Sequence, residues 1–200
     1  MTPNPTTPNP TIPTVYLAGF DVFYPDAAAR AAVMKQRCAA HGLEGLFPSD
    51  IAVDPTGLTP AEFATEIFRR DVLLIDRCDI VAANVNAFRG PEPDSGTCFE
   101  LGYGYAKGKA LYAYTEGPPT MPERVAAHHG PVTTGTDGVR LDPAGMHVED
   151  IGAPVNLVIA VPATVVLGTF DDCLRRIRAD LGERAADLTA ATDTCSNTDT

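Results

Sequence analysis

The stretch Cys78–Lys109, CDIVAANVNAFRGPEPDSGTCFELGYGYAKGK, contains a strand, a loop and a helix in succession. Ile80–Val85 is largely apolar, as a strand covered on both faces of a sheet should be. Ser95 then begins a helix that is expected to end before Gly108, and Ala110–Thr115 is a further apolar run. This order of strand, helix and strand with short connections is typical of a parallel sheet flanked by helices.

The same alternation continues outward from this stretch. Further strands are expected at Val15–Ala18 and Leu43–Phe47, and further helices from Pro25-Asp26 to Gly42, from the capping sequence at Thr59 to about Arg77, and from Thr169 through Leu181. Residues 116 to about 154 are expected to form a long loop. The sequence therefore predicts one doubly wound, flavodoxin- or Rossmann-like α/β domain over residues 15–184, between disordered tails at 1–14 and 185–200.

The composition excludes several classes of protein. The chain has 200 residues, with 15 Lys and Arg against 26 Asp and Glu, so its formal net charge is −11. Binding to nucleic acid or to an anionic membrane surface is therefore not expected, and no apolar run approaches the roughly 20 residues of a membrane span. The first fourteen residues lack the features of a signal peptide. Five cysteines without a CxxC pair favour a cytoplasmic location, and four scattered histidines argue against a metal site.

Glu100 is the main candidate for chemistry. It lies about one turn inside the helix that begins at Ser95, and its neighbours at i−4 and i+4 are Gly96 and Gly104. These glycines indicate either close packing of the helix on the sheet or free access to Glu100, since glycine costs a helix about 1 kcal/mol relative to alanine. The helix N-terminus is expected to favour an ionised carboxylate, which makes Glu100 a candidate nucleophile.

Two further carboxylates are expected near the carboxyl ends of the strands. Asp79 lies at the start of the strand Ile80–Val85 or at the end of the helix before it, and Asp94 directly precedes the helix that begins at Ser95. Each could instead be a simple cap or turn residue. Three carboxylates around one cleft suit a reaction with a positively charged transition state, such as glycosyl transfer through an oxocarbenium ion. Phosphoryl transfer is not expected, because no GxxxxGK[ST] loop is present.

Several motifs resemble those of the nucleoside 2-deoxyribosyltransferase family. They are Tyr16-Leu17-Ala18-Gly19, Phe88-Arg89-Gly90-Pro91-Glu92-Pro93, Asp94-Ser95-Gly96-Thr97-Cys98-Phe99-Glu100-Leu101-Gly102, Val148-Glu149-Asp150 and Pro154-Val155-Asn156-Leu157. The resemblance extends from about Val15 to Leu181, and the D-x-G-x-x-x-E-L-G spacing is its most specific part. It implies an exchange of nucleobases on 2′-deoxynucleosides, without a cofactor, through a deoxyribosyl ester on the enzyme and with retention of configuration.

The resemblance also implies a role for individual residues. Glu100 matches the nucleophile and Tyr16 the tyrosine that orients it. Asp79 is matched to the acid that protonates the departing base, and Asp94 to the residue at the hydroxyl end of the sugar. Asn156 matches an asparagine supplied by a neighbouring subunit, which implies a homo-oligomer with a shared active site.

Other positions are expected to border the substrate. Gly19 and Gly96 belong to the matching motifs, Phe20 is expected to stack on the base, and Asp50 is expected to help line the base site. The chain departs from the family pattern at two places, with Val158 instead of a methionine and Ala52 in the area of a glutamine. The preference for purine or pyrimidine bases is therefore not carried over.

Three alternatives remain at this stage. A 2′-deoxynucleoside 5′-monophosphate N-glycosidase has the same fold and nucleophile, but it resembles S-x-G-x-x-x-E at this motif, and the carboxylate of Asp94 repels a phosphate. A nucleotide-sensing module without activity is compatible with the fold alone. A phosphoribohydrolase of the lysine-decarboxylase-like group shares Gly96-Thr97 and Glu100 but has P-G-G before them, where this chain has Pro93-Asp94-Ser95.

Overall fold

The main sheet has five parallel strands in the order β2-β1-β3-β4-β7. The computed structural model describes residues 12–195. The strands are β1 (Thr14–Ala18), β2 (Glu44–Leu46), β3 (Ile80–Asn84), β4 (Ala110–Thr115) and β7 (Thr164–Leu167). The chain leaves β1 for β2 on one side and returns to β3 on the other, so the topological switch point lies between β1 and β3. The predicted doubly wound fold is confirmed.

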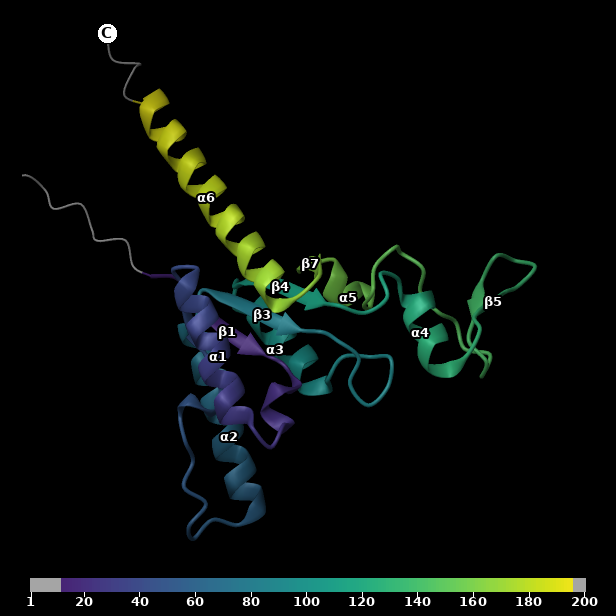
Figure 1. Ribbon diagram of the computed structural model, residues 1–200, viewed down its shortest axis with the longest axis horizontal. Coiled ribbons are helices and arrows are strands. Elements are labelled where there is room, and N and C mark those ends of the chain that lie inside the picture. The colour runs from purple at the N-terminus through teal and green to yellow at the C-terminus, as the bar shows by residue number, and fades with distance from the viewer. Residues whose placement is uncertain (1–11, 196–200) are drawn as a thin grey trace, which may run out of the picture.

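Helices cover both faces of this sheet, as Figure 1 shows. They are α1 (Ala27–Ala40), α2 (Pro60–Arg77), α3 (Ser95–Ala106), α4 (Met121–His129), α5 (Leu157–Ala160) and α6 (Phe170–Cys195), with short 3-10 turns η1 (Phe20–Phe23) and η2 (Pro48–Asp50). Helices α1 and α6 pack in one core layer, and α2, α3 and α5 pack in the other. The two layers separate because successive strand side chains point to opposite faces.

The alternation is clearest in β1. Val15 and Leu17 are buried against α1 and α6, whereas Tyr16 and Ala18 are buried against α2 and α3. The α2 helix starts as predicted, since the Thr59 hydroxyl accepts from the Glu62 N–H while the Glu62 carboxylate accepts from the Thr59 N–H. The sequence signals at the strands and helix starts near the switch point therefore led to the right elements.

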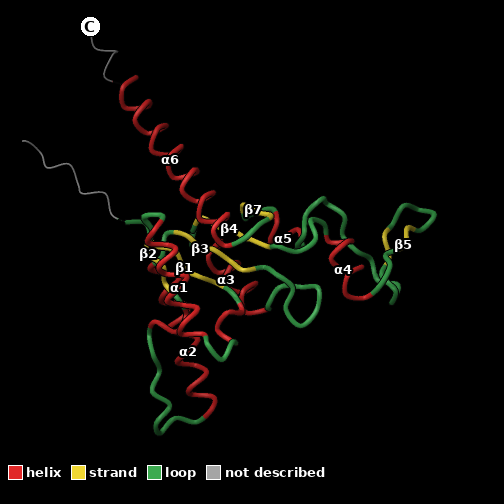
Figure 2. The backbone as a smooth tube through the Cα atoms, in the orientation of Figure 1, coloured by secondary structure: helices red, strands yellow, loops and turns green. Residues whose placement is uncertain are grey.

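The region 116–154, predicted to be one loop, contains regular structure. It holds α4 and a two-stranded antiparallel sheet of β5 (Thr133–Thr134) and β6 (Arg140–Leu141). Together they form an arm that projects from the carboxyl end of the main sheet (Figures 1 and 2). The α4 helix has a capping box of Thr120 and Glu123 that sequence reasoning missed. The fifth strand, β7, was missed too, because its four residues come directly after the short α5.

The ends of the domain differ in part from the prediction. Helix α6 continues to Cys195, so the described part of the expected C-terminal tail is helical, as its alanine-rich sequence favours. Residues 1–11 and 196–200, which hold most of the expected N-terminal tail and the end of the C-terminal one, lie outside the described residues. None of the helices in residues 12–195 is long and apolar enough to cross a membrane.

Candidate active site

The site is centred on the start of α3, beside the carboxyl end of β1. Asp94 is the N-cap of α3, and its Oδ2 accepts from the Thr97 N–H at 3.1 Å and from the Thr97 hydroxyl at 3.3 Å. Asp94, Gly96 and Glu100 border a cavity of about 520 Å³ between η1, η2, α2 and α3. Asp94 is thus both a helix cap and a wall of the cavity, so its two expected roles are compatible.

Glu100 is held by a tyrosine from the sheet. The Tyr16 hydroxyl donates to Glu100 Oε1 at 2.6 Å, and the Tyr16 side chain is fully buried in the core below. A short hydrogen bond from a buried side chain fixes the carboxyl group in one orientation. Tyr16 is therefore placed where the resemblance implies that a positioning tyrosine should be.

The protonation state of Glu100 differs from the expectation. Burial raises its pKa to about 8, the hydrogen bond from Tyr16 opposes this rise, and the nearby carboxylates of Asp71 and Asp94 reinforce it. The desolvation cost and the like charges together outweigh the helix N-terminus, which was expected to keep Glu100 ionised. The site therefore favours the protonated form of Glu100 more than ordinary solvent exposure would.

The second carboxylate of the cavity is Asp71 and not Asp79. Asp79 lies at the amino end of β3, where its exposed carboxylate accepts from the Thr14 N–H and hydroxyl, both at 2.8 Å. That is the opposite end of the sheet from the cavity, so the assignment of Asp79 as the acid beside Glu100 is wrong. Asp71, from α2, lines the cavity together with Glu100, and burial raises its pKa to about 6.

A signal for Asp71 was present in the sequence. It lies four residues after Ile67 and four before Ile75, on the apolar stripe of an amphipathic helix. A carboxylate on such a stripe is rarely buried without a functional reason. The resemblance was matched to Asp79, whereas the helical periodicity points to Asp71.

The glycines around Glu100 have different causes. A Cβ on Gly104 would lie 2.9 Å from Val81 Cγ2, so this glycine serves close packing of α3 on the sheet. Gly96 instead borders the cavity, where a Cβ would lie 2.9 Å from Asp94 Oδ2. Gly19 also lines the cavity, and a Cβ there would lie 2.8 Å from Asn84 Cβ. Both of the proposed reasons for glycine therefore occur in this region.

Two predicted base-site residues are replaced by their neighbours. Phe20 points away from the Glu100 cavity, which is lined by the exposed ring of Phe23. Asp50 forms an ion pair with Lys35 and accepts from the Phe47 N–H at 2.9 Å, and it does not line this cavity. The adjacent residues of the same turn, Pro48, Ser49, Ile51, Ala52 and Val53, line it instead. The predicted turn therefore borders the cavity, but the Asp50 side chain does not.

Asn156 does not reach the Glu100 of its own chain. It caps α5 by accepting from the Val158 N–H at 3.0 Å, and its amide donates to Glu149 Oε1 at 2.9 Å. It borders a separate, mostly apolar groove of about 1050 Å³ between α3 and α5. Val158 and Val161 are 70% and 78% exposed beside it, which leaves an apolar surface next to this amide.

A buried arginine donates hydrogen bonds to three backbone segments near the site. Arg124 of α4 is 1% exposed and donates to the main-chain carbonyls of Pro91, of Pro154 at 3.1 Å and of Val85 at 2.5 Å. Pro91 belongs to the loop before Asp94, and Pro154 precedes Asn156. Nothing in the linear sequence distinguishes this arginine, because its partners are backbone oxygens from three segments.

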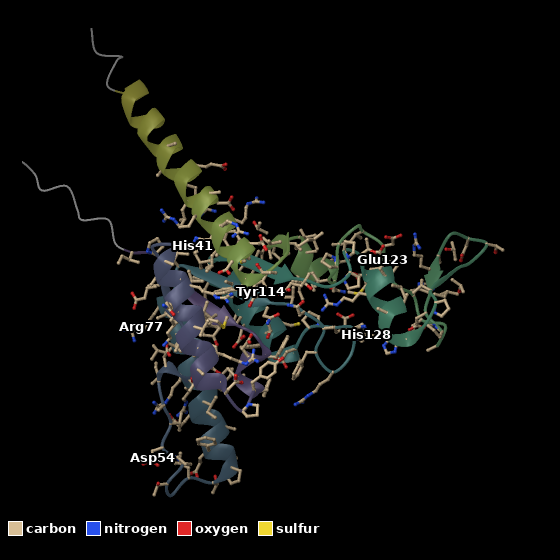
Figure 3. All side chains as sticks on the ribbon, in the orientation of Figure 1. His41, Asp54, Arg77, Tyr114, Glu123 and His128 are labelled. Atoms are coloured by element: carbon tan, nitrogen blue, oxygen red, sulfur yellow. The ribbon has the colours of Figure 1, made fainter. Side chains whose placement is uncertain are left out.

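Metal ligands do not gather in the described part of the chain. Among the residues whose side chains are described, no group of three or more His, Cys, Asp or Glu could hold a metal ion. His41, directly after α1, and His128, on the projecting arm, lie far apart (Figure 3).

Comparisons with known proteins bear on the family and on the fold. A family model described as "Nucleoside 2-deoxyribosyltransferase" matches residues 15–158. The "Uncharacterized protein C191.05c" of Schizosaccharomyces pombe is 36% identical over 126 residues, 62% of this chain and 60% of that protein. The "2-desoxiribosyltransferase from Leishmania mexicana" has a TM-score of 0.64 and 26% identity, and the match covers 84% of this chain and 97% of that one. A conserved protein from Enterococcus faecalis V583 shares the fold, with a TM-score of 0.52 and 18% identity over 85% of this chain and 99% of that one.

Proposed function

Because the chain belongs to the nucleoside 2-deoxyribosyltransferase family, we propose that it moves the 2-deoxyribosyl group of a 2′-deoxynucleoside to a second nucleobase. The observation that carries the proposal is the 2.6 Å hydrogen bond from buried Tyr16 to Glu100, at a cavity that a second carboxyl group also borders. A fixed carboxylate can attack the anomeric carbon, and a second carboxyl group can supply a proton to the departing base.

The reaction proceeds in two displacements. In the first, a Glu100 oxygen bonds to C1′, the C1′–N bond breaks, and its electron pair leaves with the base, which takes a proton from Asp71. In the second, a nitrogen of the incoming base bonds to C1′, the ester oxygen leaves as the Glu100 carboxylate, and the proton of that base passes to Asp71. Two inversions at C1′ give net retention.

The proposed first step needs a proton on Asp71 and a carboxylate at Glu100. The pKa of Glu100, about 8, is higher than that of Asp71, about 6, so a proton shared by the pair favours Glu100. The reactive form has this proton on Asp71 instead. The hydrogen bond from Tyr16 favours this form, because it stabilises the Glu100 carboxylate.

The remaining walls of the cavity suit a deoxynucleoside. The exposed ring of Phe23 offers a flat surface for the base. Asp94, at the start of α3, borders the cavity, and its carboxylate would accept hydrogen bonds from sugar hydroxyls. The same carboxylate would repel a 5′-phosphate, which favours nucleosides over their monophosphates.

We further propose that two subunits complete each site. Asn156 lies beside exposed apolar residues of α5 and away from its own Glu100, and a neighbouring copy would cover that apolar surface while receiving the amide. A Glu100→Gln chain and an Asn156→Ala chain, each nearly inactive, should then regain activity when they are refolded together. Mixed oligomers no more active than their parents would contradict the shared site.

The function is tested by incubation with 2′-deoxyinosine and adenine. Formation of deoxyadenosine together with hypoxanthine is the expected result, and the Glu100→Gln variant is the matched control. Release of hypoxanthine without deoxyadenosine would indicate an N-glycosidase that uses water. Mass spectrometry after reaction with a slow 2′-fluoro nucleoside should place the sugar on Glu100, and labelling of Asp71 or Asp94 would overturn the assignment.

A further inference from the structure

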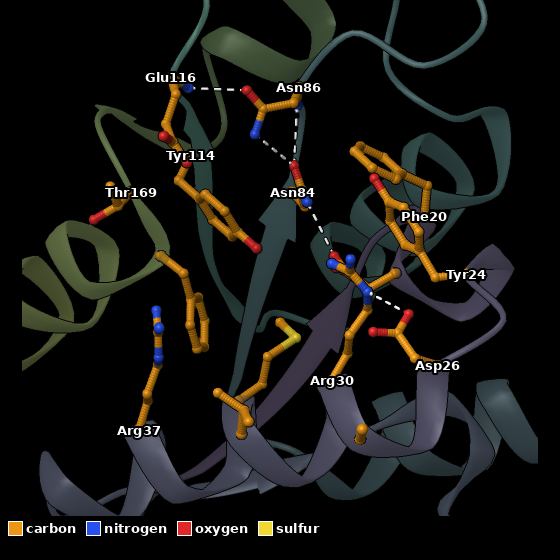
Figure 4. Close-up of a pocket in the computed structure, with 15 residues that line it drawn as sticks. Phe20, Tyr24, Asp26, Arg30, Arg37, Asn84, Asn86, Tyr114, Glu116 and Thr169 are labelled. Carbon is orange, nitrogen blue, oxygen red and sulfur yellow. Dashed lines mark hydrogen bonds and ion pairs between the residues drawn. The ribbon is translucent and has the colours of Figure 1, made fainter.

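A second cavity lies at the carboxyl ends of the strands, on the other face of the sheet from Glu100. It has a volume of about 460 Å³ and lies between η1, α1, the ends of β3 and β4, and the start of α6 (Figure 4). This volume is within the range of small-molecule sites. Glu100, Asp71 and Asp94 do not border it, so it is separate from the candidate active site.

Tyr114 supplies an unused polar group to this cavity. The residue is only 4% exposed, none of the hydrogen bonds among the described side chains involves its hydroxyl, and Figure 4 shows that hydroxyl directed toward the cavity. Tyr112 lies two residues earlier, in the same core layer, and its hydroxyl donates to Asp180 Oδ2 at 2.8 Å. Buried tyrosines normally have such a partner. The Tyr114 hydroxyl is therefore available to a molecule in the cavity.

The charges of the lining argue against an anionic ligand. Arg30 donates to Asp26 at 2.9 Å and to Asp21 at 3.4 Å, so its guanidinium already faces two carboxylates. Arg37 and Glu116 are the other charged residues of the lining, which makes two arginines against three carboxylates. A phosphate or carboxylate would meet no excess of positive charge here. An anionic ligand is therefore disfavoured.

Part of the lining is aromatic or aliphatic. The ring of Phe20 borders the cavity, Phe170 is 7% exposed, and the Arg30 guanidinium covers one face of Tyr24 at 3.6 Å from the ring centroid. Val33 and Met34 of α1 contribute aliphatic surface. Aromatic walls bind planar rings by stacking, while a single hydroxyl can donate to or accept from an atom at the ring edge. We propose that this cavity binds an uncharged planar heteroaromatic molecule of the free nucleobase class, with an edge atom hydrogen-bonded to the Tyr114 hydroxyl.

A row of three stacked rings runs from one cavity to the other. Phe20 stacks on Phe88 with ring centroids 5.1 Å apart, and Phe88 stacks on Phe23 at 5.4 Å. Phe20 borders the second cavity and Phe23 borders the cavity of Glu100. A ring held against Phe20 therefore restrains the surface offered to the substrate. This consequence rests on the proposed function, whereas the binding itself does not.

The test uses one isotope label that reports both cavities. In the full chain labelled with ¹³Cζ-tyrosine, the signals of Tyr16, Tyr24 and Tyr114 are assigned by Tyr→Phe replacement. The protein is then titrated separately with adenine, with cytosine and with inorganic phosphate. We expect a base to shift Tyr114 and Tyr16 with two different saturation curves, and phosphate to leave Tyr114 unchanged.

A matched pair of variants separates direct from transmitted shifts. Ala28 and Ala29 are adjacent exposed residues of α1, and only Ala29 borders the second cavity. Ala29→Trp should weaken the base affinity reported by the Tyr114 signal roughly tenfold or more and leave the affinity reported by Tyr16 unchanged. Ala28→Trp should alter neither affinity. In Tyr114→Phe, binding reported by Tyr24 should weaken roughly two- to tenfold, because one hydrogen bond is lost.

The alternative outcomes overturn the proposal in distinguishable ways. A shift of Tyr16 alone rejects the second site and leaves the proposed function intact. A Tyr114 shift that follows the Tyr16 curve and persists in Ala29→Trp is transmitted from the active site, which also rejects it. A response to phosphate instead of the bases would identify an anion site. No shift at either tyrosine would reject this site and also count against base binding beside Glu100.

Discussion

Replacing Tyr16 with phenylalanine isolates the contribution of one hydroxyl to the proposed reaction. The ring of Tyr16 is fully buried and packs in the core with residues of β3, α2 and α3, whereas its hydroxyl donates to Glu100 Oε1 at 2.6 Å. Phenylalanine keeps the ring and removes only the donor. The change should therefore act on the carboxyl group and leave the fold in place.

The size of the effect follows from the hydrogen bond. A hydrogen bond to a charged group contributes about 1.5–3 kcal/mol, and 1.36 kcal/mol corresponds to one pKa unit. Losing it disfavours the carboxylate, so the pKa of Glu100 should rise from about 8 to roughly 9–10. The form with Glu100 ionised and Asp71 protonated becomes rarer by the same factor, and kcat/KM should fall roughly tenfold to hundredfold at pH 7.

The assay is base exchange between 2′-deoxyinosine and adenine, measured from pH 5 to 10. Tyr16→Phe should lower kcat/KM and move the basic limb of the profile upward by roughly one to two pH units. Tyr112→Phe is the control, because its hydroxyl bonds Asp180 on the opposite face of the sheet. A basic limb that stays in place or moves downward, with the fold intact by circular dichroism, would refute the reasoning.

Three further predictions concern protons, phosphate and the loops. The wild-type kcat/KM should be bell-shaped in pH, with limbs near 6 and 8, because the pair Asp71 and Glu100 is active with one shared proton; a plateau above pH 9 would contradict this. Asp94→Ser should raise activity on deoxynucleoside monophosphates relative to nucleosides, and an unchanged ratio of the two kcat/KM values would place phosphate exclusion elsewhere. Arg124→Met should lower the free energy of unfolding by about 3 kcal/mol or more, because three buried carbonyls lose their donor. The control, Arg140→Met, breaks an exposed ion pair and should lower it by less than about 1 kcal/mol in the same denaturant titration.

The elements nearest the switch point were predictable because local signals and burial coincide there. The β3 strand is apolar and buried, and α2 begins with a capping box that the structure contains. The arm and β7 were missed for physical reasons. Strands of two to four residues carry too little periodicity to be recognised, and α4 has only nine residues.

The residues of the site were also predictable only in part. Glu100 and Tyr16 belong to distinct motifs, and their hydrogen bond agrees with the roles that the resemblance implies. Asp71 lies inside α2 and lines the cavity, whereas Asp79 lies at the amino end of β3, at the opposite end of the sheet. Arg124 was not predictable, because its function depends on three backbone carbonyls that tertiary structure brings together.

The raised pKa of Glu100 is consistent with the proposed chemistry of the site. Besides burial, the groups that raise the pKa of Glu100 are the carboxylates of Asp71 and Asp94, so the cavity opposes an additional negative charge. A sugar that develops positive charge at C1′ reverses this balance, because the same carboxylates then attract the reacting centre. The interaction is stronger in the transition state than in the ground state, which is the requirement for catalysis. The same carboxylates repel a phosphate group, so the proposed preference for uncharged nucleosides and the proposed rate acceleration have one electrostatic origin.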